Sequence, residues 1–300
     1  MAQPFTHRWC QHFKEERKIA VVDPSLKKLL ERSGLDVEIW VFGKNDRQAL
    51  LQKLRSDQPD AAWVMTNSFG SILPYWKSGV TKRYGFGGSW SRFLLTNRAD
   101  RSLLSLPQGE RWLKAFDLGP IDEPPTWLDL DFSPNHPPHL LVFPGAKYGP
   151  SKQWDAKAYA EVISQAIASG WKATLVGSPD EKKDADSILE HLETPIENWC
   201  GKYRLDDLLD AVAKLKRPLA LANDSGAMHL MAACGLPTLG LYFSTSSANT
   251  PPAFGNVKIL EADISCRPCY SRNCPKGHYD CRKKILADDV FKELSSLTEN

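Results

Sequence analysis

The stretch PGAKYGPSKQW combines two glycines with two lysines, a composition typical of loops that hold phosphate groups. Gly145 and Gly149 let the backbone approach a ligand closely, and Lys147 and Lys152 supply positive charge. A loop of this composition is often only a surface turn. It directly follows an apolar run at 140–143, however, and the carboxyl end of a strand is where α/β proteins bind anions. We therefore predict an anion site here.

A second candidate is the run NDSGAMH, which follows another apolar run and opens a segment of helical period. Free backbone N–H groups and the positive end of the helix dipole would face a ligand there, an arrangement that suits a diphosphate. The alternative is that Asp224 or Ser225 only caps the helix and that the histidine only packs. The candidate binding residues are Asp224, Ser225, Gly226 and His229.

A third candidate is the acidic pair in VGSPDE. Gly177 ends a strand-like run, and Asp180 or Glu181 stands where a carboxylate could accept hydrogen bonds from a ribose. A solvent-exposed acidic helix start explains the same residues, and the residues alone favour that interpretation.

Four of the seven cysteines lie in CRPCYSRNCPKGHYDC, with His278 among them, at the spacing C-x2-C-x4-C-x6-C. Four thiolates could enclose a structural zinc ion, although paired C-x2-C knuckles are the usual zinc pattern. Free thiols or a disulfide are the alternatives. We expect this segment to form a surface loop remote from the anion site. The candidate zinc ligands are Cys266, Cys269, Cys274 and Cys281.

The periodicity of apolar residues indicates the elements that must position these loops. Short apolar runs alternate with segments of helical period in both halves of the chain. Such alternation predicts an α/β fold with doubly wound parallel sheets. Strands are expected at 19–22, 37–42, 61–65, 140–143, 173–176, 219–222 and 238–243, and helices at 4–13, 26–31, 46–55, 155–170 and 225–234.

A proline-rich seam divides the chain into two halves. Six prolines lie between residues 119 and 138, and proline supplies no N–H group to a helix or sheet. We therefore expect two Rossmann-like domains, 1–120 and 139–300, joined by a linker at 121–138 and facing each other across a cleft.

Composition narrows the function classes. The 38 basic and 36 acidic residues give a net charge of +2, which disfavours a nucleic-acid partner and a zinc-ribbon nucleic-acid binder. The sequence contains neither a membrane-spanning apolar run nor a signal peptide, so a cytoplasmic protein is expected. One basic run could meet an anionic acceptor or draw the protein to an anionic membrane surface. It comprises Lys77, Lys82, Arg83, Arg92, Arg98 and Arg101, with Asp100 as its one acid.

In their order and spacing, PGAKYGPSKQW, VGSPDE, NWCGKYRLDDL and NDSGAMHLMAA resemble the ADP-heptose:lipopolysaccharide heptosyltransferases of glycosyltransferase family 9, particularly its heptosyltransferase II group. The resemblance covers almost the whole chain. It implies a GT-B fold in which the N-terminal domain receives the acceptor and the C-terminal domain binds ADP-heptose. It also implies an inverting transfer of L-glycero-D-manno-heptose onto the lipid A-linked lipopolysaccharide inner core, without a metal in catalysis, at the inner face of the inner membrane.

The resemblance assigns roles by position. Lys152 would hold the donor phosphates and stabilise the leaving group, with Lys147 as a further charge nearby. Asp224 would contact the heptose, Glu181 the ribose, and 201–205, including Tyr203, would flank the adenine. The diphosphate site would be lined by Ser225, Gly226 and His229.

The start of the sequence departs from the family. Family members open with a strand and a Gly-Asp turn whose aspartate is the candidate general base, followed by a segment like MAQP. Here MAQP stands at the beginning, so we expect the first strand and the base to be missing and transfer to be weak or absent. Asp23 could be considered as a substitute but matches no base in the family. The alternative function is a nucleotide-sugar-binding protein that does not catalyse transfer.

Overall fold

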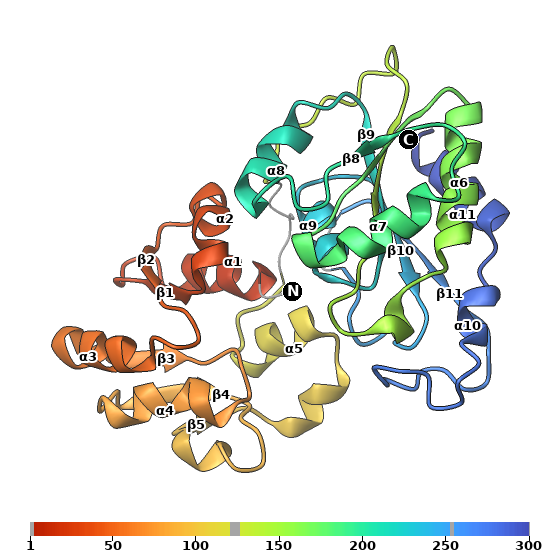
Figure 1. Ribbon diagram of the computed structural model, residues 1–300. Helices are drawn as coiled ribbons and strands as arrows, with labels where there is room; N and C mark the ends of the chain where they lie inside the picture. The colour runs from red at the N-terminus through yellow and green to blue at the C-terminus, as the bar shows by residue number, and fades with distance from the viewer. Residues whose placement is uncertain (1–2, 121–126, 253–254, 300) are drawn as a thin grey trace. The chain divides into compact units, whose positions relative to one another are not determined.

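The computed structural model describes residues 3–120, 127–252 and 255–299. The chain divides into two compact units, Met1–Asp122 and Glu123–Asn300, and each unit contains parallel strands connected by helices (Figure 1). The described residues of the expected linker, 127–138, belong to the second unit. They are held there by the Arg217 N–H, which donates to the Asp131 carbonyl at 2.6 Å, and by Lys216, which donates to the Asp131 carboxylate at 2.8 Å.

The strands of the first unit form two separate parallel sheets. β1 (Ile19–Val22) pairs with β2 (Glu38–Val41), and β4 (Lys82–Gly85) lies between β3 (Ala61–Trp63) and β5 (Asn97–Arg98). Among the described residues, no strand joins β1 to β3.

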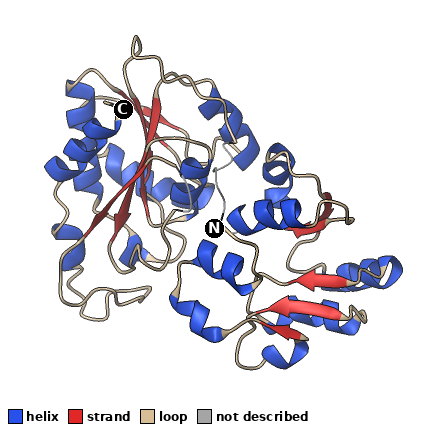
Figure 2. Cartoon of the chain, turned by 180° about the vertical axis from the view of Figure 1, so that it is seen from behind, coloured by secondary structure: helices blue, strands red, loops and turns tan. Residues whose placement is uncertain are grey.

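Both sheets of the first unit nevertheless contribute to one hydrophobic core. Trp40 of β2 and Ala62 of β3 are buried in the same cluster, with Leu50 and Leu54 of α3 and Ile72 of α4. A second cluster contains Phe5 of α1 and Trp112 of α5, and Trp63 of β3 packs against it. Figure 2 shows these helices beside the strands. The helices are α1 (Gln3–His12), α2 (Lys27–Arg32), α3 (Arg47–Asp57), α4 (Phe69–Lys77) and α5 (Gln108–Ala115).

The second unit is built on a six-stranded parallel sheet with the order β11-β10-β9-β6-β7-β8. Its central strands are buried on both faces, as the continuous apolar runs predict. The strands are β6 (His139–Phe143), β7 (Lys172–Leu175), β8 (Glu197–Asn198), β9 (Pro218–Asn223), β10 (Thr238–Tyr242) and β11 (Val257–Glu261).

Of the six described α-helices of this unit, α6 to α9 connect strands, and α10 and α11 follow the last strand. The buried face of α6 carries Tyr159, Val162, Ile163 and Ala166, the apolar positions whose spacing predicted a helix. In the described part of the chain, no helix has the length and apolar character needed to span a membrane. The helices are α6 (Ala156–Ala168), α7 (Lys182–Leu189), α8 (Leu205–Ala213), α9 (Gly226–Ala233), α10 (Asp280–Lys283) and α11 (Ala287–Leu297).

Candidate functional site

The order of strands in the second unit by itself indicates where a ligand is expected to bind. The chain runs from β6 outward through β7 to β8, then crosses back to β9 on the other side of β6. Ligands of open α/β sheets bind where the order reverses, outside the carboxyl ends of the two central strands. Those ends are adjacent here, because Phe143 pairs with Ala222. The lysine loop, residues 144–154, follows β6, and residues 224–229 follow β9.

Lys152 of the lysine loop and Asp224 after β9 form a buried ion pair at this position. The Lys152 Nζ lies 2.5 Å from the Asp224 Oδ2 and also donates to the Asp224 carbonyl at 3.3 Å. Their side chains are 13% and 4% exposed. The Thr245 hydroxyl donates to the same carboxylate oxygen at 2.6 Å. The two residues named from separate motifs thus lie in one place.

The start of α9 beside this pair has no side-chain cap. Ser225 occupies the N-cap position, but its hydroxyl makes no cap hydrogen bond, and its buried Oγ has no hydrogen-bond partner among the described residues. Asp224 is directed to Lys152 and Thr245 instead of to the helix. The capping alternative is therefore wrong for both side chains. A β-carbon placed on Gly226 would meet no atom within 4 Å, so the helix start is open to a ligand.

His229 lies one turn into α9, with its Nε2 4.0 Å from the Asp224 Oδ1. The pKa of His229 is lowered to about 4, mainly by burial; the Lys152 charge adds to this lowering, and Asp224 opposes it. The imidazole is therefore neutral at pH 7 and can donate one hydrogen bond and accept another.

Asn223 fixes the two loops relative to each other. Its side-chain amide donates to the Pro144 carbonyl at 2.7 Å, and its Oδ1 accepts a hydrogen bond from the Tyr159 hydroxyl at 2.8 Å. Asn223 is fully buried, so these bonds are shielded from water. Lys152 also lies over the Tyr148 ring, 4.9 Å from its centroid.

Glu181 lies against the lysine loop but is already engaged locally. A β-carbon on residue 145 would lie 1.9 Å from the Glu181 Oε1. Only glycine at this position therefore leaves room for the Glu181 carboxylate. The Glu181 Oε2 accepts hydrogen bonds from the Ser178 N–H at 2.7 Å and hydroxyl at 2.9 Å, forming a capping box. Glu181 therefore has a structural role in this capping box. Its contact with a ribose stays a prediction.

Lys147 and Tyr203 are not brought into the Lys152–Asp224 pair. Lys147 is exposed on the lysine loop. Tyr203 follows β8 and packs edge-on against Trp199, with ring centroids 5.2 Å apart, and Lys202 lies over the Tyr203 ring. Their contacts with a ligand stay predictions.

The cysteine segment, residues 266–281, is not remote from the lysine loop, and that expectation is wrong. The Ser151 N–H donates to the Arg272 carbonyl at 3.1 Å, and the Tyr148 hydroxyl donates to the Tyr270 carbonyl at 2.5 Å. A β-carbon on Gly149 would lie 2.7 Å from the Arg272 carbonyl oxygen. The segment thus supports the loop that carries Lys152.

The structure offers no preformed metal site in this segment. Cys266, Cys269, Cys274 and Cys281 are free thiols, and no three His, Cys, Asp or Glu side chains are grouped to hold a metal within the described ranges. The zinc ion stays a prediction from sequence spacing.

Sequence reasoning missed Thr245, which binds Asp224. A usable signal was present, because Ser244 and Thr245 directly follow the strand expected at 238–243 and so lie at the same sheet edge as the other loops. Two arginines of the basic run in the first unit are bound to the protein's own backbone. The Arg83 guanidinium donates to the Leu94 carbonyl, and Arg92 donates to the Phe86 and Ala99 carbonyls, so both serve the fold.

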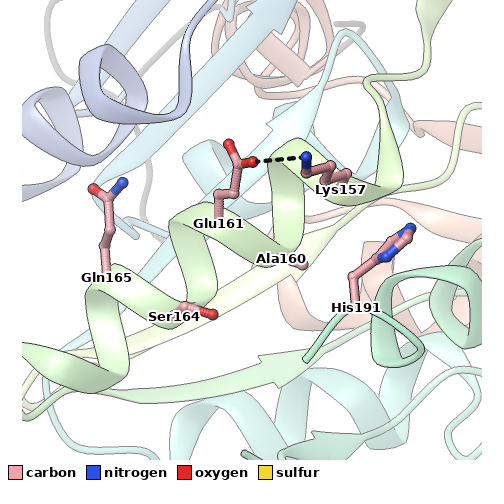
Figure 3. A pocket seen from close by; sticks show the side chains of 6 residues that line it. All are labelled: Lys157, Ala160, Glu161, Ser164, Gln165 and His191. Atoms are coloured by element: carbon pink, nitrogen blue, oxygen red, sulfur yellow. Dashed lines mark ion pairs between the residues drawn. The ribbon is translucent and has the colours of Figure 1, made fainter. Parts of the chain in front are cut away.

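A surface hollow of about 370 Å³ lies along α6, away from these groups (Figure 3). Its one ion pair joins Lys157 and Glu161 at 4.0 Å, four residues apart on the helix. None of the predicted binding residues lines it. Its lining residues are Lys157, Ala160, Glu161, Ser164, Gln165 and His191.

Comparison with known proteins decides the family. Residues 47–280 match the model of glycosyltransferase family 9 (heptosyltransferase), which is more than half of the chain. The chain belongs to glycosyltransferase family 9. As a member of this family it is a glycosyltransferase of the heptosyltransferase type.

Relatives and solved structures of the family agree. Lipopolysaccharide heptosyltransferase 2 of Salmonella typhimurium is 29% identical over 278 residues, covering 84% of this chain and 79% of that protein. The structure of E. coli ADP-heptose lps heptosyltransferase II has a TM-score of 0.82 and 25% identity, covering 99% of this chain and 94% of that chain. The fold class is therefore GT-B. E. coli heptosyltransferase WaaC, solved with ADP, shares the fold at 15% identity and a TM-score of 0.72, covering 97% of this chain and 93% of that chain.

Proposed function

We propose that this glycosyltransferase moves L-glycero-D-manno-heptose from ADP-heptose to the lipopolysaccharide inner core, with inversion at the anomeric carbon. The observation that carries the proposal is the open start of α9, where the Ser225 hydroxyl has no partner among the described residues and the Lys152–Asp224 pair lies alongside. A diphosphate supplies the acceptors that such a helix start lacks. The solved family member with bound ADP supports this ligand class.

In the proposed reaction, the acceptor hydroxyl oxygen bonds to the anomeric carbon of the heptose. The bond from that carbon to the diphosphate oxygen breaks, ADP leaves with the electron pair, and the hydroxyl proton passes to a base. Lys152 stabilises the charge that develops on ADP, together with the N–H groups of α9. Neutral His229 donates a hydrogen bond to a phosphate oxygen. Asp224 orients Lys152 and contacts the sugar.

We assign no general base among the described residues. Asp23 follows β1, and its Oδ1 accepts hydrogen bonds from the Ser25 hydroxyl at 2.7 Å and the Ser25 N–H at 3.1 Å. These bonds hold the pKa of Asp23 below its usual value and weaken it as a base. Asp23→Asn should therefore change the rate of transfer by less than about twofold.

Calorimetry with ADP tests the donor site. Lys152→Ala should weaken ADP binding by about 1.5–3 kcal/mol, the cost of losing a charged hydrogen-bonding partner. Lys157→Ala, which removes an exposed lysine from α6, is the matched control and should bind ADP like the wild type. Equal affinities of wild type and Lys152→Ala would exclude the assignment.

A second candidate function is nucleotide-sugar binding without transfer, because the hydrogen bonds from Ser25 weaken Asp23, the one base considered among the described residues. ADP release from ADP-heptose, measured with a lipid A-linked inner-core acceptor, separates the two. Binding without turnover by the 300-residue protein supports the second function. Turnover of about 1 per second or more supports transfer.

A further inference from the structure

Arg267 of the cysteine segment is a largely buried cation that binds the backbone around the end of β10. Its guanidinium donates to the carbonyls of Phe243 at 2.5 Å, Thr245 at 2.6 Å and Ala262 at 2.7 Å. The Arg267 side chain is 10% exposed. Arginine carries its N–H donors in a rigid planar fork, whereas the lysine ammonium is one point on a flexible stem. Arginine is therefore suited to hold these carbonyls at fixed positions.

Glu261 binds the same stretch of backbone, residues 243–247, which we call the β10 loop. The Glu261 Oε1 accepts a hydrogen bond from the Ser247 N–H at 2.5 Å and lies 3.4 Å from the Arg267 Nη2. Arg267 and Glu261 thus bind the β10 loop on both sides of Thr245 and are themselves an ion pair. A network of this kind holds a loop more firmly than separate hydrogen bonds would.

The β10 loop connects to both members of the Lys152–Asp224 pair. The Thr245 hydroxyl donates at 2.6 Å to the Asp224 Oδ2, the oxygen that also binds the Lys152 Nζ. The hydroxyls of Ser244 and of Ser151, which precedes Lys152, are hydrogen-bonded at 3.1 Å. Both serines, Thr245 and Asp224 are buried. A displacement of the β10 loop would therefore change the geometry of the ion pair.

We propose that Arg267 is a positioning residue for the donor site. Through the β10 loop and Thr245, it holds Asp224 and thereby Lys152 in the orientation that binds a diphosphate. Each nitrogen of its guanidinium already donates to a carbonyl, so Arg267 acts by position and not by binding phosphate. The identity of the ligand rests on the proposed function, whereas the hold on the ion pair does not.

A reactivity measurement tests the hold on the ion pair without any ligand. Acylation by an N-hydroxysuccinimide ester, followed by peptide mapping, compares buried Lys152 with exposed Lys147 on the same loop. Arg267→Lys should raise the rate of Lys152 labelling relative to Lys147 at least about threefold, because the pair opens more often. Thr245→Val, which removes only the hydroxyl contact, should do the same and covers the case in which Arg267→Lys does not fold.

Arg217→Lys is the matched control. Arg217 also donates to backbone carbonyls of the second unit, those of His136 and Thr298, but it lies before the start of β9, at the other end of that strand from Asp224. The labelling ratio of Lys152 to Lys147 should stay at its wild-type value in this variant.

Calorimetry with ADP adds a functional readout. Arg267→Lys and Thr245→Val should each weaken ADP binding about fivefold or more, and the double variant should bind within about twofold of Thr245→Val, because both changes act on one contact. Thr245→Ser, which keeps the hydroxyl, should bind like the wild type. A general structural role of Arg267 would instead give losses that multiply.

The two readouts distinguish failure of this proposal from failure of the proposed function. If the wild type binds no ADP, the donor assignment fails, and the labelling ratio alone decides whether Arg267 holds the pair. The proposal is wrong if Arg267→Lys and Thr245→Val leave that ratio unchanged, or if Arg217→Lys raises it equally. It is also wrong if the effects of Arg267→Lys and Thr245→Val on ADP affinity are independent.

Discussion

Substituting either Lys152 or Asp224 should destabilise the second unit. Substituting both should cost less free energy of unfolding than the sum of the two single substitutions. Lys152→Met leaves the Asp224 carboxylate, 4% exposed, with the Thr245 hydroxyl as its main remaining partner. Removing one partner of a buried ion pair costs about 3–5 kcal/mol, because the other charge stays buried without compensation. Since Thr245 still donates to Asp224, we expect the lower end, about 3 kcal/mol.

Hydrogen exchange of the β6 and β9 amides measures this free energy of unfolding within the second unit. The double variant Lys152→Met/Asp224→Asn should recover about 1–3 kcal/mol relative to the sum of the single variants, since the two residues share one interaction. Lys157→Met, which breaks the exposed pair with Glu161, should cost less than about 0.5 kcal/mol. Strictly additive effects of the two single variants, within about 0.5 kcal/mol, would refute the reasoning.

Three further predictions follow from packing and titration. A β-carbon on Gly240 would lie 2.5 Å from the Met228 Sδ inside the core, so Gly240→Ala should lower the free energy of unfolding by about 1–3 kcal/mol in urea denaturation. Backbone N–H groups lower the pKa of the Cys274 thiol, whereas burial raises that of Cys200 to about 12, so iodoacetamide at pH 8 should label Cys274 first in peptide mapping; faster labelling of Cys200 would contradict this. Burial lowers the pKa of His229 to about 4, below its unfolded value near 6.5, so its stabilisation is complete above pH 6.5 and lost as pH falls towards 4. His229→Gln should flatten the pH dependence of the free energy of unfolding over that range, as urea denaturation at a series of pH values would show.

The elements that hold the site could be predicted from sequence because they are buried on all sides. β6 and β9 appear as continuous apolar runs at 140–143 and 219–222. The observed β6 is one residue longer at its start, and β9 is one residue longer at each end. Because these buried strands are apolar, the polar residues of this region lie in the loops that follow them. Lys152 and Asp224 could therefore be recognised as candidate site residues. Their pairing required the strand order, which local periodicity does not contain.

Short elements and distant contacts could not be predicted in this way. β5 and β8 have two residues each, too few to establish a period. The contact of the cysteine segment with the lysine loop joins residues about 120 positions apart, as between Tyr148 and Tyr270. Local patterns carry no information about such contacts. The expectation of a remote loop was wrong because position beyond the last strand was taken to mean distance from the site.

The start of α9 shows where a rule for local structure fails at a functional position. Serine before a helix is normally a cap worth about 1 kcal/mol, and Asp224–Ser225 reads as such a cap. In the structure, Ser225 makes no cap bond and Asp224 is directed to Lys152 instead. The helix thus lacks the capping hydrogen bond that its sequence predicts. Its first N–H groups have no side-chain acceptor. Conflicts between local preference and observed geometry are expected where a ligand completes the structure, and under the proposed function the acceptor at this helix start is the diphosphate of the donor.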